Sequence, residues 1–358
     1  MVLLHKFFCI TMNTFGQNWS FTSFGESHGA AIGGVLDGVP AGMHIDFDLI
    51  RRELDRRAGR EVTGDGVQQV TGDGVQQVTG DGVQQVTGDG VQVTGVSVRA
   101  KNEPDEVEWL SGVIVNTDRC ADGVQRTDLI TLGTPIAFLI RNRDARPEDY
   151  EALRCSFRVG HADRTYQQKY GIRDWRGGGR ASARETAARV VAGCLARQTL
   201  AAQGISIRAE LVQVGTETDP NRFAETIARY QREGDSIGGI IACTVSGLPA
   251  GTGEPLFHKL QAELAFAILS INACKGFEYG TGFAGVGQPG SAINAISGGI
   301  AGGISDGTDL SFRCVFKPTP STPKAGVKGR HDACVAVRAV PVVEAMTALC
   351  LADLLTVR

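Results

Sequence analysis

Four arginines and three consecutive glycines lie within GIRDWRGGGRASARET, residues 171–186. Ser182 and Glu185 have the spacing of a capping box, so a helix is expected to begin just after the glycines. Backbone N–H groups and the positive end of the helix dipole attract anions at such a point, and glycine lets a ligand approach the backbone. Arginine adds forked, permanently charged donors that suit phosphate and carboxylate. The stretch therefore predicts a cradle for a polyanionic small molecule.

The alternative for this stretch is a glycine loop with solvated arginines. Cations at a helix N-terminus oppose the dipole by about 0.3–1 kcal/mol each. Arg180 and Arg184 would therefore be unfavourable there without an anion, which favours the anion site. The stretch contains neither GxxxxGK[ST] nor GxGxxG, so it is not a Walker loop or a Rossmann loop.

Two of the six histidines lie in glycine-flanked loops beside an acid or a hydroxyl: His28 in GESHG and His161 in VGHAD. Histidine titrates near neutrality and suits proton transfer, so both are candidates for acid–base chemistry. A hydrogen-bonded structural histidine is the alternative for each. His331 in GRHDAC is a weaker candidate, because its neighbours Arg330 and Asp332 could carry the site.

The composition limits the class of protein. The chain has 358 residues, 42% of them hydrophobic, and a formal net charge of −3. This is globular composition, and it lacks the basic surplus of a nucleic-acid-binding protein. The nine cysteines form no CxxC pair and the histidines no HxxxH or HExxH pair. We therefore expect no metal site, and buried free thiols in a reducing cytoplasm.

An internal repeat indicates a duplicated fold. GESHGAAIGGVLDGVPAG (25–42) aligns without gaps to GDSIGGIIACTVSGLPAG (234–251). Each copy predicts a loop, a strand, a Gly-x-Pro-Ala-Gly turn and then a helix, over 46–57 and 254–272. In the second helix Leu256, Leu260, Leu264 and Ile268 would share one face. His28 aligns with Ile237, so the turn can be built without histidine, and this favours a chemical role for His28.

Further elements follow from hydrophobic patterning. Val- and Ile-rich runs predict strands over 134–142, 204–215, 311–318 and 332–343. Longer apolar periodic segments predict helices over 182–204 and 343–357. Both element types are spread along the chain, which predicts a mixed architecture with strands enough for two sheets.

A second repeat, which is exact, indicates an insertion rather than a duplicated fold. VTGDGVQQ begins at Val62, Val70 and Val78, and a shortened copy begins at Val86. Its Gly-Asp-Gly turns allow small hairpins or disorder, but one valine at each end of a Gly/Gln stretch gives little stacking surface for a binding module. We therefore interpret 62–95 as an inserted loop.

The domain boundaries follow from the two ends of the chain. Residues 1–11 are apolar but too short for a membrane span and lack a signal-peptide cleavage site, so they are expected to be an extension, with Met12 a possible start. Residues 12–358 are expected to form a single domain.

Several motifs together resemble the chorismate synthase family. They are FGESHG, GHADRTYQQKYGIRDWRGGGRASARET, GDSIGG, SINACKGFEYGTGF, GGISDG, KPTPS and GRHDACVAVRAVP, and they run in family order from about residue 13 to the C-terminus. The resemblance implies an α+β fold, a β-α-β sandwich with internal pseudo-two-fold duplication, assembled as a homotetramer. It agrees with the duplication seen in the sequence.

The resemblance also implies an activity. The family converts 5-enolpyruvylshikimate 3-phosphate to chorismate and phosphate by a 1,4-anti elimination in the shikimate pathway of aromatic amino-acid biosynthesis. Reduced FMN is required without net redox change, and NAD(P)H serves only indirectly, for flavin reduction by an external reductase. A cytoplasmic protein with a small-molecule substrate, and without nucleic acid or membrane partners, is therefore expected.

Site residues follow from the family pattern. His28, supported by Ser27, would act as an acid near the leaving phosphate, and His161 would protonate or stabilise the flavin. Asp332 would assist removal of the C6 proton through flavin N5. The positions that match flavin contacts are Arg180, Ala181, Ser182, Asn272, Ala273, Gly302, Lys317, Pro318, Thr319, Pro320, Ser321 and Arg330. The positions that match substrate-binding arginines are Arg57, Arg184 and Arg330.

The sequence departs from the family between DRRAGR and NEPDEVEWLSG, where the VTGDGVQQ repeat replaces a short Ser-Arg-x-Thr-Thr segment that contacts substrate. The second arginine of that segment is missing or replaced by Arg60 or Arg99. Residues 115–130 form an insertion, and the stretches after GTGF and after KPTPS are shorter than usual.

Two alternatives follow: a degenerate flavin- or phosphate-binding homologue with little or no turnover, and a repeat-mediated interaction protein.

Overall fold

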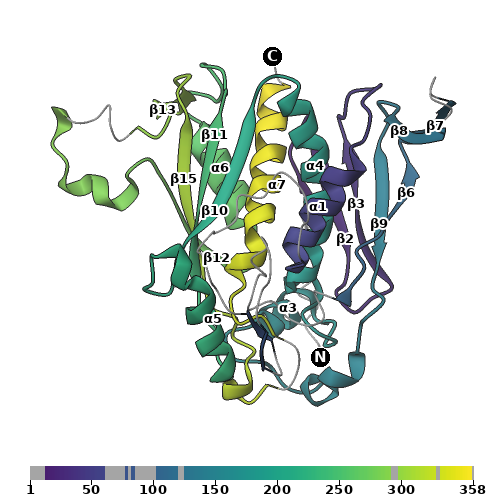
Figure 1. Ribbon diagram of the computed structural model, residues 1–358, viewed down its shortest axis with the longest axis vertical. Coiled ribbons are helices and arrows are strands. Elements are labelled where there is room, and N and C mark those ends of the chain that lie inside the picture. The colour runs from purple at the N-terminus through teal and green to yellow at the C-terminus, as the bar shows by residue number, and fades with distance from the viewer. Residues whose placement is uncertain are drawn as a thin grey trace, which may run out of the picture.

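A layer of helices lies between two antiparallel sheets (Figure 1). The computed structural model describes residues 13–60, 77–79, 82–84, 102–119, 125–291, 297–327 and 331–356. The first sheet has the strand order β1 (Thr14–Phe15), β2 (Ser20–Gly25), β3 (Ala31–Asp37), β9 (Ile136–Arg141) and β6 (Val107–Ser111). The second has the order β10 (Ser206–Val214), β11 (Gly239–Ser246), β15 (Leu310–Phe316) and β12 (Cys274–Tyr279). The helices between them are α1 (Phe47–Ala58), α4 (Thr186–Ala201), α6 (Leu260–Leu269) and α7 (Ala336–Leu355).

The remaining described elements lie outside these three layers or connect them. They are the hairpins β4 (Gln77–Thr79) with β5 (Gly82–Gln84), β7 (Val113–Arg119) with β8 (Gln125–Thr131), and β13 (Ile300–Ala301) with β14 (Ile304–Ser305), the helices α3 (Asp163–Tyr170) and α5 (Phe223–Arg232), and short 3-10 helices that include η1 (Pro147–Leu153), η2 (Gly179–Ala181) and η3 (Ala183–Glu185). No helix within the described ranges is both long and apolar enough to cross a membrane.

The two halves of the chain share one topology. The first half runs β2, β3, α1, β6, β9, α4, and the second runs β10, β11, α6, β12, β15, α7. In each sheet the strands lie in the order first, second, fourth, third of their half. A short hairpin, β7–β8 or β13–β14, stands between the third and fourth strand of each half. The predicted α+β sandwich with internal duplication is therefore confirmed, over more of the chain than the aligned repeat covers.

The core lies where the helices meet the inner faces of the sheets. α4 and α7 are apolar on nearly all sides, and residues such as Val191, Leu195, Val343 and Leu349 are fully buried. Buried and partly exposed residues alternate along β9, as is typical of a strand with one face in the core. Ile136, Phe138 and Ile140 point inward and are 0% exposed. The central helices therefore anchor both sheets.

Two predicted elements were wrong. Residues 332–343 were expected to form a strand, but most of them belong to α7, because a β-branched apolar run does not distinguish a strand from a helix buried on all sides. The helix predicted over 254–272 begins only at Leu260, and Leu256 is 73% exposed. The other helix and strand predictions agree with α1, α4, β9, β10 and β15 to within a few residues at their ends.

The structure describes the two predicted insertions to different extents. The insertion at 115–130 falls in the β7–β8 hairpin. Within the repeat, β4 and β5 pair as a small hairpin, with Val78 opposite Val83. Most of the repeat, residues 1–12, and Arg99 lie outside the described residues.

A close helix crossing generates the first testable prediction. A Cβ atom added at Gly193 of α4 would lie 2.3 Å from Cβ and 2.4 Å from Cα of Ala345 on α7. We expect Gly193→Val to lower the free energy of unfolding by about 1–3 kcal/mol through overpacking, measured by urea denaturation. The control Ala201→Val, at an exposed position of the same helix, should change it by less than about 0.5 kcal/mol. Equal stability of the two variants would contradict this packing.

Candidate active site

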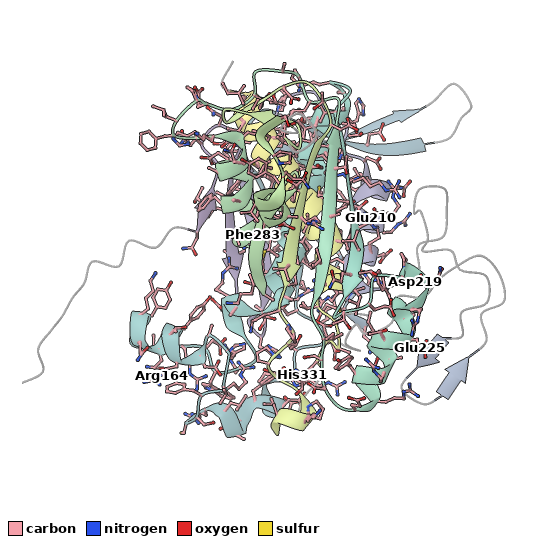
Figure 2. All side chains as sticks on the ribbon, turned by 90° about the vertical axis from the view of Figure 1, so that its left-hand side faces the viewer. Arg164, Glu210, Asp219, Glu225, Phe283 and His331 are labelled. Carbon is pink, nitrogen blue, oxygen red and sulfur yellow. The ribbon has the colours of Figure 1, made fainter. Side chains whose placement is uncertain are left out.

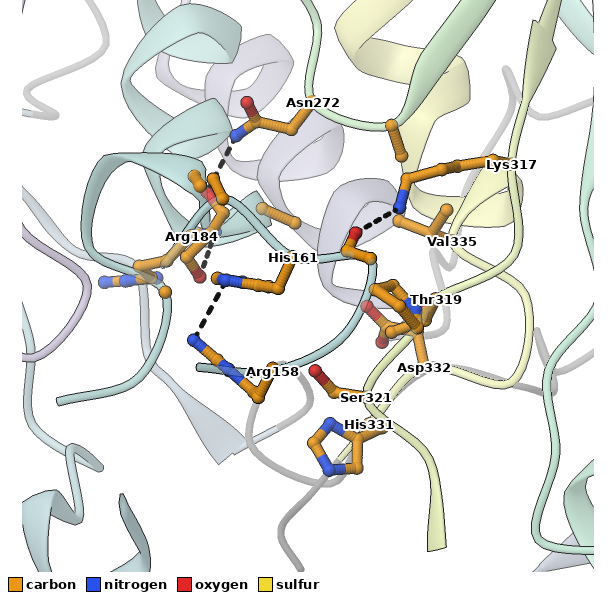
Figure 3. A pocket seen from close by; sticks show the side chains of 18 of the residues that line it. Arg158, His161, Arg184, Asn272, Lys317, Thr319, Ser321, His331, Asp332 and Val335 are labelled. Atoms are coloured by element: carbon orange, nitrogen blue, oxygen red, sulfur yellow. Dashed lines mark hydrogen bonds between the residues drawn. The ribbon is translucent and has the colours of Figure 1, made fainter. Parts of the chain in front are cut away.

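A cavity of about 420 Å³ (Figure 3) lies at the end of the sandwich that carries α3, an element labelled in Figure 1. Figure 2 shows Arg164 of α3 and His331 at this same end of the molecule. The cavity is lined by residues of the loop after β2, the helix α1, the segment before β6, the segment between β9 and α4, the turn between α6 and β12, and the segment that runs from β15 into α7. Both halves of the duplicated fold therefore contribute to it.

Buried arginines and carboxylates form one wall of the cavity. Arg57 of α1 and Arg184 of η3 both donate to the carboxylate of Asp105, and the Arg57 Nη2–Asp105 Oδ2 distance is 2.8 Å. Arg338 of α7 pairs with Asp332 at 2.9 Å and also donates to the Arg57 backbone carbonyl. These side chains are all less than 10% exposed. The wall is a continuous charged network that fixes its guanidinium groups.

Burial and neighbouring charges shift the pKa values of two groups in this wall, Arg57 and Asp105. Burial lowers the pKa of Arg57 to about 10, and Asp105 partly offsets that effect. Burial would raise the pKa of Asp105, but Arg57 and Arg184 outweigh it and lower that pKa to about 2. Among the described lining residues, five are Lys or Arg and two are Asp or Glu. The lining therefore favours anions.

His28 is enclosed at a second side of the cavity. It is 5% exposed, and its Nδ1 lies 3.0 Å from Ser27 Oγ. The ring of Tyr150 meets it edge-on at 4.9 Å between centroids. A Cβ atom on Gly177, which has φ +65°, would come within 2.2 Å of Nδ1. The glycine is thus required for the histidine to occupy its position.

His161 also lines the cavity, beside Arg158 (Figure 3). Its Nδ1 is 2.9 Å from Asp163 Oδ1 and 3.1 Å from Arg158 Nη2. Burial would raise the pKa of Asp163, but hydrogen bonds from Arg158 and His161 outweigh it and hold that pKa well below its usual range. Asp163 is therefore an ionised acceptor for both neighbours.

The segment after β15 forms the third side. Lys317 Nζ donates to the Gly160 carbonyl at 3.2 Å, and burial lowers the pKa of Lys317. Pro318 and Pro320 give this side an apolar surface. Asn272 donates to the Ser182 carbonyl at 3.0 Å, which ties the turn after α6 to the start of α4. A flat apolar group and an anionic group can both find partners here.

Most of the predicted site residues lie together around this cavity. Those that line it are His28, Arg57, His161, Ala181, Ser182, Arg184, Asn272, Ala273, Lys317, Pro318, Thr319, Pro320, Ser321 and Asp332. Ser27 lies behind His28 as its hydrogen-bond partner. The segments that carry these residues are far apart in the sequence, and the fold brings them together.

Three predicted residues are not placed in the lining. Arg180 donates to Gly25 O and Ser23 Oγ. Gly302 joins β13 to β14, and β13 lies at the opposite end of the molecule from α3 (Figure 1). Arg330 lies outside the described residues.

The predicted anion cradle differs from the structure in detail. Of its four arginines only Arg184 lines the cavity. Arg173 donates to backbone carbonyls of Leu153 and Ser156, and Arg176 pairs with Asp174. The expected capping box does not form, because Ser182 Oγ accepts from Arg184 N and the Glu185 carboxylate binds Asn272 and Arg189. The glycines mainly make room for His28 and the 3-10 turns.

The sequence prediction also missed lining residues. Those with polar or charged side chains are Glu103, Tyr150, Arg158, Tyr166 and Arg338. Arg158 and Arg338 stand within or directly beside motifs that were quoted, in VGHAD and VRAVP. Their nearness in the sequence to His161 and Asp332 was the available signal, but it does not give the contacts that these arginines make.

Comparison with known proteins identifies the family. The fold and the site define a small-molecule enzyme with a cationic cavity and two enclosed histidines. The family model described as chorismate synthase matches residues 19–94 and 90–356. The chain therefore belongs to the chorismate synthase family, as its motifs predicted, and its enzyme class is that of the lyases.

Individual relatives agree with this assignment. The chain is 41% identical to the chorismate synthase of Phocaeicola vulgatus over 394 residues, covering 95% of this chain and 97% of that protein. It is also 41% identical to that of Porphyromonas gingivalis, covering 96% and 95%. A crystal structure of a chorismate synthase matches with a TM-score of 0.66 and 26% identity, covering 95% of this chain and 92% of that one.

Asp105 provides the prediction for this site. Asp105→Asn removes the charged partner of two buried guanidinium groups, those of Arg57 and Arg184, so the free energy of unfolding at pH 7 should fall by about 3–5 kcal/mol. Because the folded pKa of about 2 lies below the ordinary 3.8, the carboxylate stabilises the fold above pH 3.8, and this is lost as the pH falls toward 2. The difference in the free energy of unfolding between the wild type and Asp105→Asn should therefore shrink by about 2 kcal/mol as the pH falls from 3.8 to 2.

Urea denaturation from pH 6 to pH 2 measures both effects. The control Asp48→Asn removes an exposed carboxylate that pairs with Arg51 on the same face of α1, and should change stability by less than about 1 kcal/mol. If the difference in unfolding free energy between the wild type and Asp105→Asn stays constant as the pH is lowered, Asp105 is not held ionised by its arginines.

Proposed function

We propose that this chain converts 5-enolpyruvylshikimate 3-phosphate to chorismate and phosphate by a 1,4-anti elimination. The single observation that carries the proposal is the cavity itself, where fixed guanidinium groups and two enclosed imidazoles face one space. The substrate carries a phosphate and two carboxylates, and guanidinium forks bind both groups well. Family membership and the cavity lining support the same substrate class.

Reduced FMN is the proposed cofactor, and the residues present fit it. Ala273, Pro318 and Pro320 offer an apolar surface for a flat ring, beside the amine of Lys317. Arg57 Nε is buried and has no hydrogen-bond partner among the described residues, so the cavity wall holds a donor that an anion can satisfy. We propose that Ser182, Asn272 and 317–321 hold the cofactor. When bound there, reduced FMN would supply the reducing chemistry that promotes C–O cleavage without net redox change.

His28 is the proposed acid at the leaving group. The C3–O bond breaks, the phosphate leaves with the bonding electrons, and an imidazolium beside it provides the proton or charge that stabilises the leaving oxygen. The Ser27 hydroxyl at Nδ1 and the Tyr150 ring hold the imidazole in place. Preorganisation of this kind lowers the barrier without rearrangement during the reaction.

Asp332 is the residue proposed to assist removal of the proton from C6. The Arg338 guanidinium fixes one of its oxygens at 2.9 Å and leaves the carboxylate at the cavity surface. Arg184 and Arg57 bind the anionic groups of the substrate and so set the ring between Asp332 and the histidines. His161, held by Asp163, would stabilise the cofactor by offering a hydrogen bond or a proton to it.

A homotetramer in the cytoplasm, supplied with reduced flavin by an external reductase, completes the proposal. Large apolar side chains remain exposed on or beside the first sheet, including Phe24 at 40%, Leu110 at 58% and Leu132 at 49%. Contact between copies would remove such surfaces from water. NAD(P)H enters only through that reductase. The lining residues present argue against a degenerate homologue without turnover.

His28→Ala tests the proposed acid. Under anaerobic conditions with reduced FMN, kcat for formation of the conjugated diene should fall by about 10²–10⁴-fold, because the positioned proton donor is lost. Binding of FMN should change by no more than a few fold. The control His44→Ala removes an exposed histidine that pairs with Asp128, and should keep the wild-type rate. Full activity of His28→Ala would contradict the assignment.

A further inference from the structure

One buried arginine contacts the supports of both histidines. Arg158 is 8% exposed and donates from Nε to Asp163 Oδ2 and from Nη2 to Asp163 Oδ1, each at 2.8 Å. Its backbone N–H adds a third bond to Asp163 Oδ2 at 3.1 Å. Its Nη2 also donates to the Gly177 carbonyl at 2.8 Å. This fork therefore ties the segment 158–163 to the glycine loop before α4.

The first arm of this fork fixes the tautomer of His161. Asp163 is ionised and accepts only, and it lies 2.9 Å from His161 Nδ1. Nδ1 therefore carries a hydrogen. The two hydrogens of Arg158 Nη2 are then taken by Asp163 and by the Gly177 carbonyl, which accounts for the 3.1 Å approach of Nη2 to Nδ1 without a further bond. Nε2 becomes the nitrogen that can exchange a proton.

The second arm reaches His28. The Gly177 backbone that Arg158 holds lies against His28 Nδ1, so closely that no side chain fits between them. The Arg158 guanidinium also lies 6.0 Å from the centre of the Tyr150 ring, within cation–π range, and that ring packs edge-on against His28. Arg158 therefore contacts both groups that pack against His28, the Gly177 backbone and the Tyr150 ring.

We propose that Arg158 is a positioning residue that sets the tautomer of His161 and the orientation of His28 together. The proposal rests on the proposed function, since it assigns these two imidazoles to one reaction. Asp163 is its partner for the His161 arm. A lysine cannot replace the arginine, because a single ammonium cannot bind both carboxylate oxygens and a carbonyl in a fixed plane.

Imidazole ¹⁵N NMR on the protein without flavin or substrate tests the proposal directly. Signals are assigned with His28→Gln and His161→Gln. In the wild type His161 should be the Nδ1–H tautomer. In Arg158→Lys the signals of both His28 and His161 should change, and His161 should lose its single tautomer, whereas His44 and His258, which are exposed and outside the lining, should stay unchanged.

Activity gives the second readout. Arg158→Lys should lower kcat by about 10²-fold and change KM by less than about 3-fold, because displacement of the imidazoles affects the reaction more than binding. Arg154→Lys is the matched control: its side chain is 65% exposed and packs against Trp175. That variant should keep kcat within about 2-fold.

The outcomes separate the possibilities. Unchanged His28 and His161 signals in a folded Arg158→Lys protein overturn the proposal, and a change at His161 alone overturns the link to His28. Should Arg158→Lys fail to fold, Asp163→Asn must abolish the Nδ1–H preference of His161, and Tyr150→Leu must move the His28 signal. If the wild type makes no chorismate, the proposed function fails, while the NMR result still decides the role of Arg158.

Discussion

The site depends on the burial of several arginines at the place where the two halves of the fold meet. A guanidinium group withdrawn from water is stable only if a carboxylate is close and well aligned. Asp105 meets this requirement between Arg57 and Arg184, and Asp332 meets it for Arg338. These carboxylates leave the wall with an excess of positive charge toward the cavity. The same network stabilises the fold and prepares the space for an anionic ligand.

The duplicated topology explains where that space lies. The two sheets and four helices repeat one pattern, and they bury an apolar core that has no chemistry of its own. Arg57 and Arg338 of the site come from the repeated helices α1 and α7, but most of the lining comes from segments in which the halves differ. Between β9 and α4 the first half inserts η1, α3 and the glycine loop, whereas the corresponding segment after β15 is much shorter. His28 itself replaces the aliphatic Ile237 of the second half. Asymmetry added to a symmetric frame thus creates the proposed active site.

Sequence reasoning predicted most strands and helices of the frame and most of the lining, because motifs such as GESHG, VGHAD and KPTPS carry their side chains into one cavity. It placed a strand at 332–343, where a helix buried on all sides has no amphipathic period to reveal it. It also assigned Arg173, Arg176 and Arg180 to ligand binding, but local carbonyls and carboxylates already accept their hydrogen bonds. Arg158 was missed because its role depends on contacts with Gly177 and Tyr150 that no spacing in the chain encodes.

The central claim is that one cavity of this protein eliminates phosphate from a trianionic cyclohexene in the presence of reduced FMN. An anaerobic single-turnover reaction of the full chain, followed by absorbance of the diene and by release of inorganic phosphate, tests it most directly. We predict that the two products form at the same rate and in equal amounts with reduced FMN, and that neither forms with oxidised FMN. Tight flavin binding with no phosphate release, or phosphate release without the diene, would contradict it.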